Sequence, residues 1–256
     1  MMQTTKKIAA GALALSMALS LTACSSYTTL DQIKEDGKII MGTNAAFPPF
    51  EYTEGEQIVG VDAEIAAEIA KDLGVELEIK NMDFDSIIPS VTTGKIAFGA
   101  AGMTVNEERQ KNVDFSIKYV TSSQYVILPE DSDITSPDQL EGKKIGVQTG
   151  TTGDLYATDE IEGATVNPYK NALDAAMDLK SGKVDAVIID KLPAETIVKQ
   201  NDGLKLLEEP LTEEEYAICV GKGNEELLNA INGTLQRLID EGKIDEYLEE
   251  HNSALQ

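Results

Sequence analysis

The chain has 256 residues, with 45 acidic and 21 basic side chains, a formal net charge of -24 at pH 7 and 42% hydrophobic residues. This length and apolar content suffice for one large domain or two small ones. The acidity argues against nucleic acid, and against anionic lipid, as the partner of the folded body.

The N-terminus differs from the rest of the chain. Lys6 and Lys7 precede an apolar run from residue 8 to 21, and small residues precede Cys24. This order is typical of a secretory signal peptide, which predicts a signal peptide at 1–23. The sequence Leu-Thr-Ala-Cys resembles the bacterial lipobox, although an ordinary signal peptide with a chance cysteine gives the same pattern. We expect lipidated Cys24 to anchor an exported protein to the outer face of the cytoplasmic membrane, with residues 24–29 as the tether.

Strands and helices alternate in the first part of the chain. Ile65, Ile69 and Leu73 recur at helical spacing and are followed by Gly74, a common helix terminator. The predicted elements are a strand at 38–43, a hairpin at 50–60 with its turn at 53–56, a helix at 62–73, a strand at 75–80, a short helix at 84–95 and a strand at 96–100. Thr104 and Glu107 then form a capping-box pattern, so we expect a helix to start at Thr104.

The same plan begins again after an extended segment at 119–128. The predicted elements are a short helix capped by Ser136, a strand at 144–148, a helix after Thr152, a strand at 164–169, a helix at 171–183, a strand at 184–190, a helix at 191–200, strands at 204–207 and 216–221, and two helices in 224–251 broken near Gly242. "TGKIAFGAAG" and "SGKVDAVIID" are a weak internal echo of each other. We therefore predict two α/β lobes, each a mostly parallel sheet flanked by helices. Lobe 1 comprises 30–122 and 216–256, and lobe 2 comprises 123–215.

Few residues are suited to catalysis or metal binding. The chain has one histidine, His251, near its C-terminal end, so Ser-His and Cys-His catalysis have little support. If Cys24 carries lipid, Cys219 is alone in an apolar strand, where a thiol behaves as a small hydrophobe. No metal-ligand spacing is present. We expect no enzyme activity, no cofactor and no metal.

Four predicted strands end in residues suited to a ligand. They are Asn44 and Phe47 after 38–43; Ala101, Gly102, Thr104 and Arg109 after 96–100; Thr151 and Thr152 after 144–148; and Asp190 after 184–189. In open α/β sheets, ligands bind outside the carboxyl ends of strands. An arginine matches a carboxylate, and an aspartate matches an ammonium. A small ligand that has both a carboxylate and an ammonium is an α-amino acid. Phe47 and Phe84 would then form apolar walls around its side chain, and Asn44 would make a polar contact.

Other interpretations of these residues remain open from the chemistry alone. Arg109 could pair on the surface with Glu107, Glu108 or Asp114. Thr104 could serve only to cap its helix, and Asp190 could cap the helix that follows it. The two phenylalanines could belong to the core. The sequence "GVQTGTTG" is not a phosphate loop, because the required Gly-Lys-Ser/Thr is absent.

Six segments resemble, in order and spacing, the polar amino-acid-binding proteins, the family 3 extracellular solute receptors of ABC importers. They are "GTNAAFPPFEY", "GVDAEIAAEIAKDLG", "FDSIIPSVTTGK", "AAGMTVNEERQKNVDFS", "GKKIGVQTGTT" and "GKVDAVIID". The resemblance spans about residues 30 to 250. It implies a two-lobed periplasmic-binding-protein type II fold, with two mixed or mostly parallel sheets joined by two crossover strands, at "SSQYVIL" and in the segment entering "YAICVG".

The resemblance also implies roles for individual residues. Arg109 matches the arginine that binds the ligand carboxylate, and Asp190 matches the aspartate that binds the ammonium. Other contacts of the carboxylate match Ala101, Gly102, Thr104, Thr151 and Thr152. Gln148 matches a position that touches ligand in several relatives, and the side-chain pocket matches Asn44, Phe47 and Phe84.

Many members have Asp where this chain has Asn44, so a basic ligand is less favoured but not excluded, and glutamine or cystine stays open. The implied partners of this monomer are a free polar amino acid and a membrane permease. A dehydratase-like enzyme and a soluble accessory sensor are the alternatives.

Overall fold

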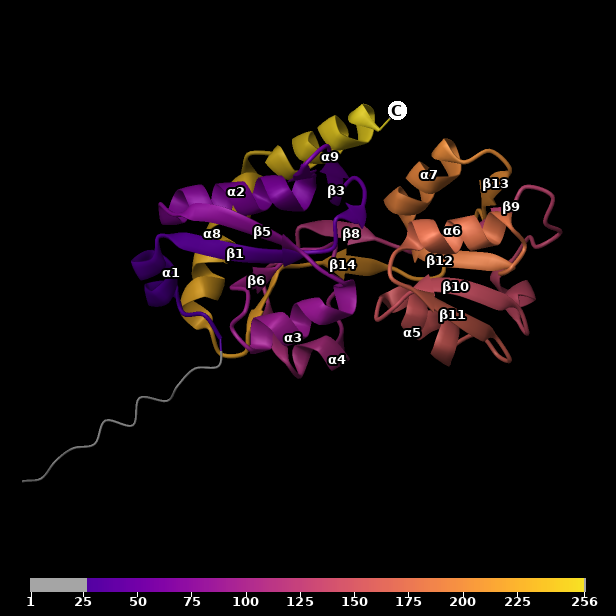
Figure 1. Cartoon of the computed structure of the whole chain (residues 1–256), viewed down its shortest axis with the longest axis horizontal. Helices are drawn as coiled ribbons and strands as arrows, with labels where there is room; N and C mark the ends of the chain where they lie inside the picture. The colour runs from indigo at the N-terminus through magenta and orange to yellow at the C-terminus, as the bar shows by residue number, and fades with distance from the viewer. Residues whose placement is uncertain (1–26, 256) are drawn as a thin grey trace, which may run out of the picture.

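The computed structural model describes residues 27–255, which form two α/β lobes side by side (Figure 1). Residues 1–26 lie outside the described part, and with them the predicted signal peptide and Cys24. Of the predicted tether, residues 27–29 lie against the first lobe: the Tyr27 hydroxyl donates to the Gly223 carbonyl at 3.2 Å, and the Thr28 hydroxyl to the Gly94 carbonyl at 3.1 Å.

The first lobe contains a five-stranded sheet in the order β5-β1-β6-β15-β7. Strand β1 pairs in parallel with β5 and β6, whereas β15 runs antiparallel to β6 and β7. Its strands are β1 (Lys38–Thr43), β5 (Glu76–Asn81), β6 (Phe98–Gly99), β7 (Val113–Phe115) and β15 (Cys219–Gly221), with a separate small sheet of β2 (Ala46–Phe47), β3 (Glu51–Glu54) and β4 (Gln57–Val59). Its helices are α1 (Leu30–Asp36), α2 (Val61–Leu73), η1 (Phe84–Ser86), α3 (Ile87–Thr92), α4 (Glu107–Gln110), α8 (Glu225–Asp240) and α9 (Lys243–Ala254).

The second lobe contains a five-stranded sheet in the order β11-β10-β12-β9-β13. The parallel strands are β10 (Lys144–Gln148), β11 (Thr165–Tyr169) and β12 (Ala186–Asp190), and β9 (Gln124–Pro129) and β13 (Leu204–Leu206) complete the sheet. Its helices are η2 (Pro137–Leu140), α5 (Thr152–Asp159), α6 (Ala172–Lys180) and α7 (Lys191–Gln200). Because β9 runs antiparallel to both of its neighbours, β12 and β13, this sheet is mixed, as is the sheet of the first lobe.

Two short antiparallel strands connect the lobes. They are β8 (Val120–Ser122) and β14 (Glu214–Tyr216), paired so that Glu214 lies opposite Ser122 and Tyr216 opposite Val120. A crossover strand is therefore present near each of the two segments where the resemblance implied one, "SSQYVIL" and the segment entering "YAICVG". The predicted lobe boundaries fall at the end of β8 and within β14, and the exact division of the chain stays a prediction.

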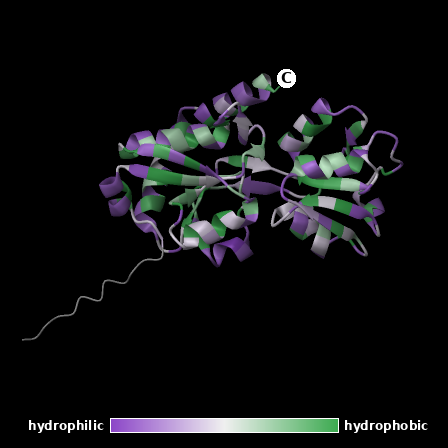
Figure 2. Ribbon diagram, viewed as in Figure 1, coloured by the Kyte–Doolittle hydropathy of each residue, from purple (hydrophilic) through white to green (hydrophobic). Residues whose placement is uncertain are grey.

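Apolar residues concentrate on the strands and on the helix faces that cover them (Figure 2). In α2, for example, Ile65 and Ile69 are fully buried, and Gly74 ends the helix in the left-handed conformation, as predicted. Burying such side chains stabilises each lobe by about 25 cal/mol per Å² of apolar surface. Because β1 is parallel to β6 and β10 is parallel to β12, their carboxyl ends lie at the same edge of each sheet, facing the other lobe. In the described part, no helix combines the length and apolar character needed to span a membrane.

Candidate functional site

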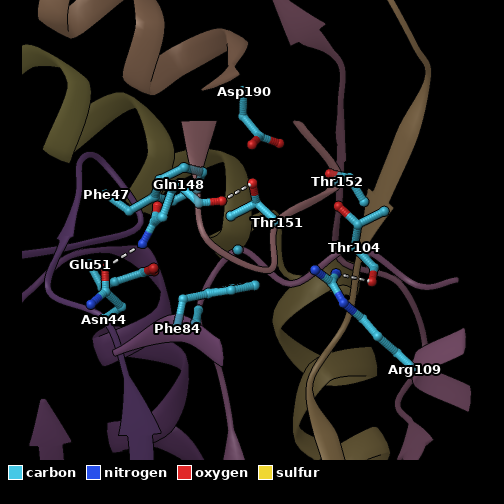
Figure 3. Close-up of a pocket in the computed structure, with 12 residues that line it drawn as sticks. Asn44, Phe47, Glu51, Phe84, Thr104, Arg109, Gln148, Thr151, Thr152 and Asp190 are labelled. Carbon is cyan, nitrogen blue, oxygen red and sulfur yellow. Dashed lines mark hydrogen bonds between the residues drawn. The ribbon is translucent and has the colours of Figure 1, made fainter. Parts of the chain in front are cut away.

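A pocket with about 300 Å³ of empty space lies between the two lobes (Figure 3). The residues that line it are Asn44, Phe47, Glu51, Phe84, Ala101, Gly102, Thr104, Arg109, Gln148, Thr151, Thr152 and Asp190. The structure thus brings together all the residues predicted to bind ligand, and adds Glu51. Their binding roles stay predictions.

The helix that carries Arg109 begins later than predicted. The N-cap of α4 is Asn106, whose side-chain oxygen accepts from the Arg109 backbone N–H at 2.8 Å. The prediction that Thr104 caps this helix was wrong, because the Thr104 hydroxyl donates instead to Glu214 Oε2 at 2.6 Å. Thr104 therefore belongs to the pocket and the interlobe region, and not to the helix start.

The guanidinium of Arg109 is buried between the lobes. Nη1 donates to the Thr104 carbonyl at 2.6 Å, Nη2 donates to the Gly150 carbonyl at 3.1 Å, and the guanidinium carbon lies 5.2 Å from the centre of the Phe84 ring. Arg109 is only 7% exposed, and this burial lowers its pKa. A guanidinium nevertheless stays charged in proteins, so the pocket contains a permanent cation. Some of its five N–H groups donate to neither of these two carbonyls and are available to a ligand.

The alternative of a surface ion pair for Arg109 does not fit the structure. Two of the three acidic neighbours named above have other partners: Glu108 pairs with Lys111, and Asp114 pairs with Lys222 at 2.7 Å. A buried arginine without a carboxylate partner among the described residues is costly, so an anionic ligand group would stabilise it.

Helix α5 brings the second lobe to the same pocket. The predicted helix is present and begins at Thr152; Thr151 is its N-cap and accepts from the Asp154 N–H. The hydroxyl of Thr152 donates to Glu214 Oε2 at 2.8 Å. The first N–H groups of α5 have no intrahelical acceptor, so they are donors for an anion.

Asp190 ends β12 and is 5% exposed. It occupies the N-cap position of α7 but makes no side-chain capping bond, and its Oδ1 accepts from the hydroxyls of Tyr216 and Ser122. Burial, followed by the nearby negative charge of Glu214, raises the pKa of Asp190 to about 7. An approaching cation would favour the ionised form.

Asn44 and Gln148 connect the lobes across the pocket. Gln148 Nε2 donates to Asn44 Oδ1 at 2.9 Å, drawn as a dashed line in Figure 3, and the Asn44 amide donates to the Met82 carbonyl at 2.8 Å. Outside the pocket, Lys170 pairs with Asp83 at 2.9 Å and also joins the two lobes. The described conformation is therefore closed around the pocket.

Three buried carboxyl groups were missed by the sequence analysis, and one of them, Asp62 of α2, is fully buried. Glu51 follows Phe50 in the hairpin and is 1% exposed, and Glu214 lies in the hinge strand β14 and is 7% exposed. Glu214 accepts from Thr104, Thr152, Gln124 and Thr212. The sequence gives little signal for Glu51 or Glu214, since Glu214 stands in a run of three glutamates typical of a solvated surface.

Cys219 does not contribute to the pocket. It is fully buried in β15, and burial raises the pKa of its thiol to about 12. It therefore packs as a small hydrophobe, as predicted. Within residues 27–255, no cluster of His, Cys, Asp and Glu side chains is arranged to hold a metal.

Comparison with known proteins agrees with this architecture. The model of the bacterial extracellular solute-binding proteins, family 3, matches residues 39–254. The arginine-binding extracellular protein ArtP of Bacillus subtilis is 34% identical, covering 88% of this chain and 90% of the relative, and the L-cystine-binding protein TcyJ of Escherichia coli is 30% identical, covering 91% and 89%.

Solved structures of similar proteins share the two-lobed fold. A crystal structure of a mutant ArgBP from T. maritima superposes with a TM-score of 0.84 at 40% identity, covering 88% of this chain and 99% of that one. This likeness confirms the predicted fold. These relatives are binding proteins and not enzymes, in agreement with the prediction made for this chain. The chain belongs to the bacterial extracellular solute-binding proteins, family 3.

Proposed function

We propose that this chain binds a polar L-amino acid between its two lobes and delivers it to an ABC permease. The observation that carries the proposal is the pocket itself, where a buried arginine of one lobe and a buried aspartate of the other face the same space. A zwitterion matches both charges, whereas an amine or an acid alone matches only one.

Arg109 is the proposed partner of the ligand carboxylate. The hydroxyls of Thr104 and Thr152 already donate to Glu214, so they have no hydrogen left for an anion while Glu214 accepts them. Arg109 and the backbone N–H groups at the start of α5 therefore hold the carboxylate. The Thr152 oxygen already accepts from Gln124 Nε2 at 3.1 Å, so the Thr104 oxygen is the better placed of the two to accept from the ligand ammonium.

Asp190 is the proposed partner of that ammonium. With a pKa of about 7, Asp190 is partly protonated near neutral pH and becomes ionised when a cation binds. Ala101 and Gly102 leave space for the backbone of the ligand beside it, because neither has a bulky side chain.

The far end of the pocket receives the ligand side chain. Phe47 and Phe84 provide apolar walls, and the amides of Asn44 and Gln148 provide polar contacts. Polar amino acids of the kind named for the relatives, arginine and cystine, fit this combination, and so does glutamine.

Binding and closure occur together in this proposal. The contacts Arg109–Gly150, Gln148–Asn44 and Lys170–Asp83 join the lobes only when they are closed. A ligand that touches both lobes adds to these contacts and shifts the population to the closed form. The closed complex is the form that a permease would recognise, and the hinge pair of β8 and β14 allows the lobes to separate again.

The proposed location is the outer face of the cytoplasmic membrane. Export and anchoring depend on the signal peptide and on lipidation of Cys24. Metabolic labelling with a radioactive fatty acid tests this part, since a Cys24→Ser variant would not be labelled.

A thermal-shift screen against all amino acids and cystine tests the binding proposal. A ligand raises the Tm by binding the folded state, and at 100 times its Kd the gain is about 2.7 kcal/mol. The matched controls are compounds that lack one α-group, such as agmatine for arginine. Shifts of the same size from agmatine and arginine would refute a site that needs the carboxylate.

A further inference from the structure

Glu214 places a buried carboxyl group at the junction of the two lobes. It lies in β14 of the hinge pair and is 7% exposed. Its Oε2 accepts from the Thr104 hydroxyl of the first lobe at 2.6 Å and from the Thr152 hydroxyl of the second lobe at 2.8 Å. Gln124 Nε2 donates to the same oxygen at 3.2 Å, and the Thr212 hydroxyl donates to Oε1 at 3.0 Å. In the described part of the chain, four uncharged donors and no ion pair therefore hold this carboxylate.

Backbone contacts fix the position of Glu214 relative to both lobes. Thr104 forms an isolated antiparallel bridge with Tyr216, two residues after Glu214. The Gln124 N–H donates to the hydroxyl of Thr212, two residues before Glu214, at 3.0 Å. Segments of both lobes therefore flank the glutamate, and the fold sets the direction in which its carboxylate points.

The hydrogen bonds to Glu214 determine which groups the two threonine hydroxyls can still bind. A threonine hydroxyl has one hydrogen and two lone pairs, and a carboxylate can only accept. The hydrogens of Thr104 and Thr152 are therefore committed to Glu214. The Thr152 oxygen also accepts from Gln124 Nε2, whereas the Thr104 oxygen accepts from no described residue. Because Thr104 lines the pocket, it presents lone pairs, and no hydrogen, to a ligand.

This acceptor lies where the α-amino group of the ligand would lie. In Figure 3, Thr104 and Thr152 are drawn between Asp190 and Arg109. In the proposed function, Asp190 holds the ligand ammonium and Arg109 holds the carboxylate, and both ligand groups are bonded to the same carbon. An ammonium on that carbon can donate to Asp190 and to Thr104, with the negative charge of Glu214 directly behind the threonine hydroxyl.

We propose that Glu214 is the positioning residue for the ligand ammonium. It takes the hydrogen of the Thr104 hydroxyl, so that Thr104 turns only lone pairs toward the α-amino group. Because Glu214 accepts from Thr104 of one lobe and Thr152 of the other, it sets this orientation while the lobes are closed. The hinge strand therefore takes part in recognition as well as in movement. This inference rests on the proposed function of the pocket.

The variant Glu214→Gln keeps the shape of the side chain and removes its charge. Its amide can donate to Thr104, which frees the threonine hydrogen to point at the ligand. We expect the affinity for the amino acid to fall by about tenfold or more, the usual cost of losing a hydrogen bond to a charged group. The desamino analogue, which keeps the carboxylate and the side chain, should lose less than about threefold, because it has no ammonium to lose.

A double-mutant cycle with Thr104→Val separates positioning from a purely structural role. Valine keeps the shape of threonine and removes the acceptor. If Glu214 acts through Thr104, adding Glu214→Gln to Thr104→Val should weaken binding by less than about threefold, since the acceptor that Glu214 orients is already gone. A glutamate with a structural role alone would cost the same in both backgrounds.

Calorimetric titrations with arginine and with glutamine come first, followed by any other amino acid that raises the Tm in the thermal-shift screen. Glu215→Gln is the matched control. Glu215 is the next residue of β14, but its side chain is 47% exposed and pairs with Lys118, so the affinity should change by less than about twofold. Circular dichroism checks folding. If Glu214→Gln does not fold, Thr104→Val alone decides: it should weaken the amino acid by about tenfold and its desamino analogue by less than about threefold.

Equal losses from Glu214→Gln in the wild-type and Thr104→Val backgrounds would overturn the proposal while leaving a working amino-acid site. Equal losses for an amino acid and its desamino analogue would do the same. Failure of every amino acid to bind the wild-type protein would instead refute the proposed function of the pocket. The two failures are therefore distinguishable.

Discussion

Arg109 of the first lobe donates a hydrogen bond from Nη2 to the backbone carbonyl of Gly150 in the second lobe, at 3.1 Å. The same guanidinium donates to the Thr104 carbonyl beside it. One side chain therefore contacts both lobes at the edge of the pocket. Binding of a ligand carboxylate to Arg109 would therefore be coupled directly to closure of the two lobes.

Replacing Arg109 by alanine should weaken amino-acid binding by about 100-fold or more, because a buried anion would lose its partner. Replacement by lysine should recover only part of the affinity, since an ammonium lacks the planar fork of donors. The measurement is the ligand-dependent rise in Tm, together with the Kd from calorimetry.

Lys111→Ala is the matched control for Arg109. Lys111 lies two residues away, but its side chain is 67% exposed and pairs with Glu108 at the surface. Exposed pairs of this kind contribute about 0–1 kcal/mol, so both stability and affinity should stay close to wild type. An unchanged ligand shift in Arg109→Ala would remove Arg109 from the site.

Asp190→Asn should have opposite effects on stability and on binding. Burial raises the pKa of Asp190 to about 7, above its value in the unfolded chain. The folded state therefore binds the proton of this carboxyl group more tightly than the unfolded state does, which stabilises the fold at low pH. This contribution to the free energy of unfolding is lost as the pH rises through about 7. Asparagine has no charge to bury. The ligand-free variant should therefore melt at a higher temperature than wild type at pH 8, with a smaller difference at pH 5.

The same variant should bind amino acids about 100-fold more weakly, because the ammonium loses its counterion. Calorimetric melting scans of the ligand-free proteins and titrations at both pH values separate the two effects. Asp159→Asn, at an exposed position late in α5, is the control and should change neither. Parallel losses of stability and affinity in Asp190→Asn would favour a purely structural role.

The fold could be predicted because local patterns and spatial arrangement agree. The helix of residues 61–73 has its apolar spacing and its terminating glycine in the sequence, and α5 begins at Thr152, where a helix start was predicted. Strand ends that carry unusual residues do meet at one pocket, because parallel strands place their carboxyl ends at one edge. The resemblance to the family added the connection between lobes, which no local pattern contains.

The details of the pocket could not be predicted, because they depend on contacts distant in sequence. Thr104 has the spacing of a capping box, yet its hydroxyl donates to Glu214, a residue separated from it by 110 positions. Glu51 is a hairpin residue next to an aromatic, and only the packing of α2 buries it beside Asp62. Charged residues that fold into the interior look, in the sequence, like charged residues at the surface.

Cys219 should be unreactive toward thiol reagents while the protein is folded. It is fully buried, and its pKa of about 12 leaves almost no thiolate at neutral pH. A Cys24→Ser background leaves Cys219 as the sole thiol, so labelling with a chromogenic disulfide should follow the fraction unfolded across a denaturant series. Rapid labelling under native conditions would contradict the burial of this strand.

Gly102→Ala should lower both stability and affinity. Gly102 has a φ of +51°, which disfavours a side chain, and a Cβ added there would lie 2.6 Å from Cε1 of Phe47. The ring of Phe47, which lines the pocket and packs against Phe50, would have to shift. We expect the free energy of unfolding to fall by about 1–3 kcal/mol and ligand binding to weaken with it.

Gly233→Ala is the control with the opposite sign. Gly233 lies in α8, and a Cβ added there meets nothing within 4 Å. Alanine stabilises a helix by about 1 kcal/mol relative to glycine. Urea unfolding of both variants, with and without ligand, should therefore move the midpoint in opposite directions, and an unchanged affinity in Gly102→Ala would show that Phe47 does not touch the ligand.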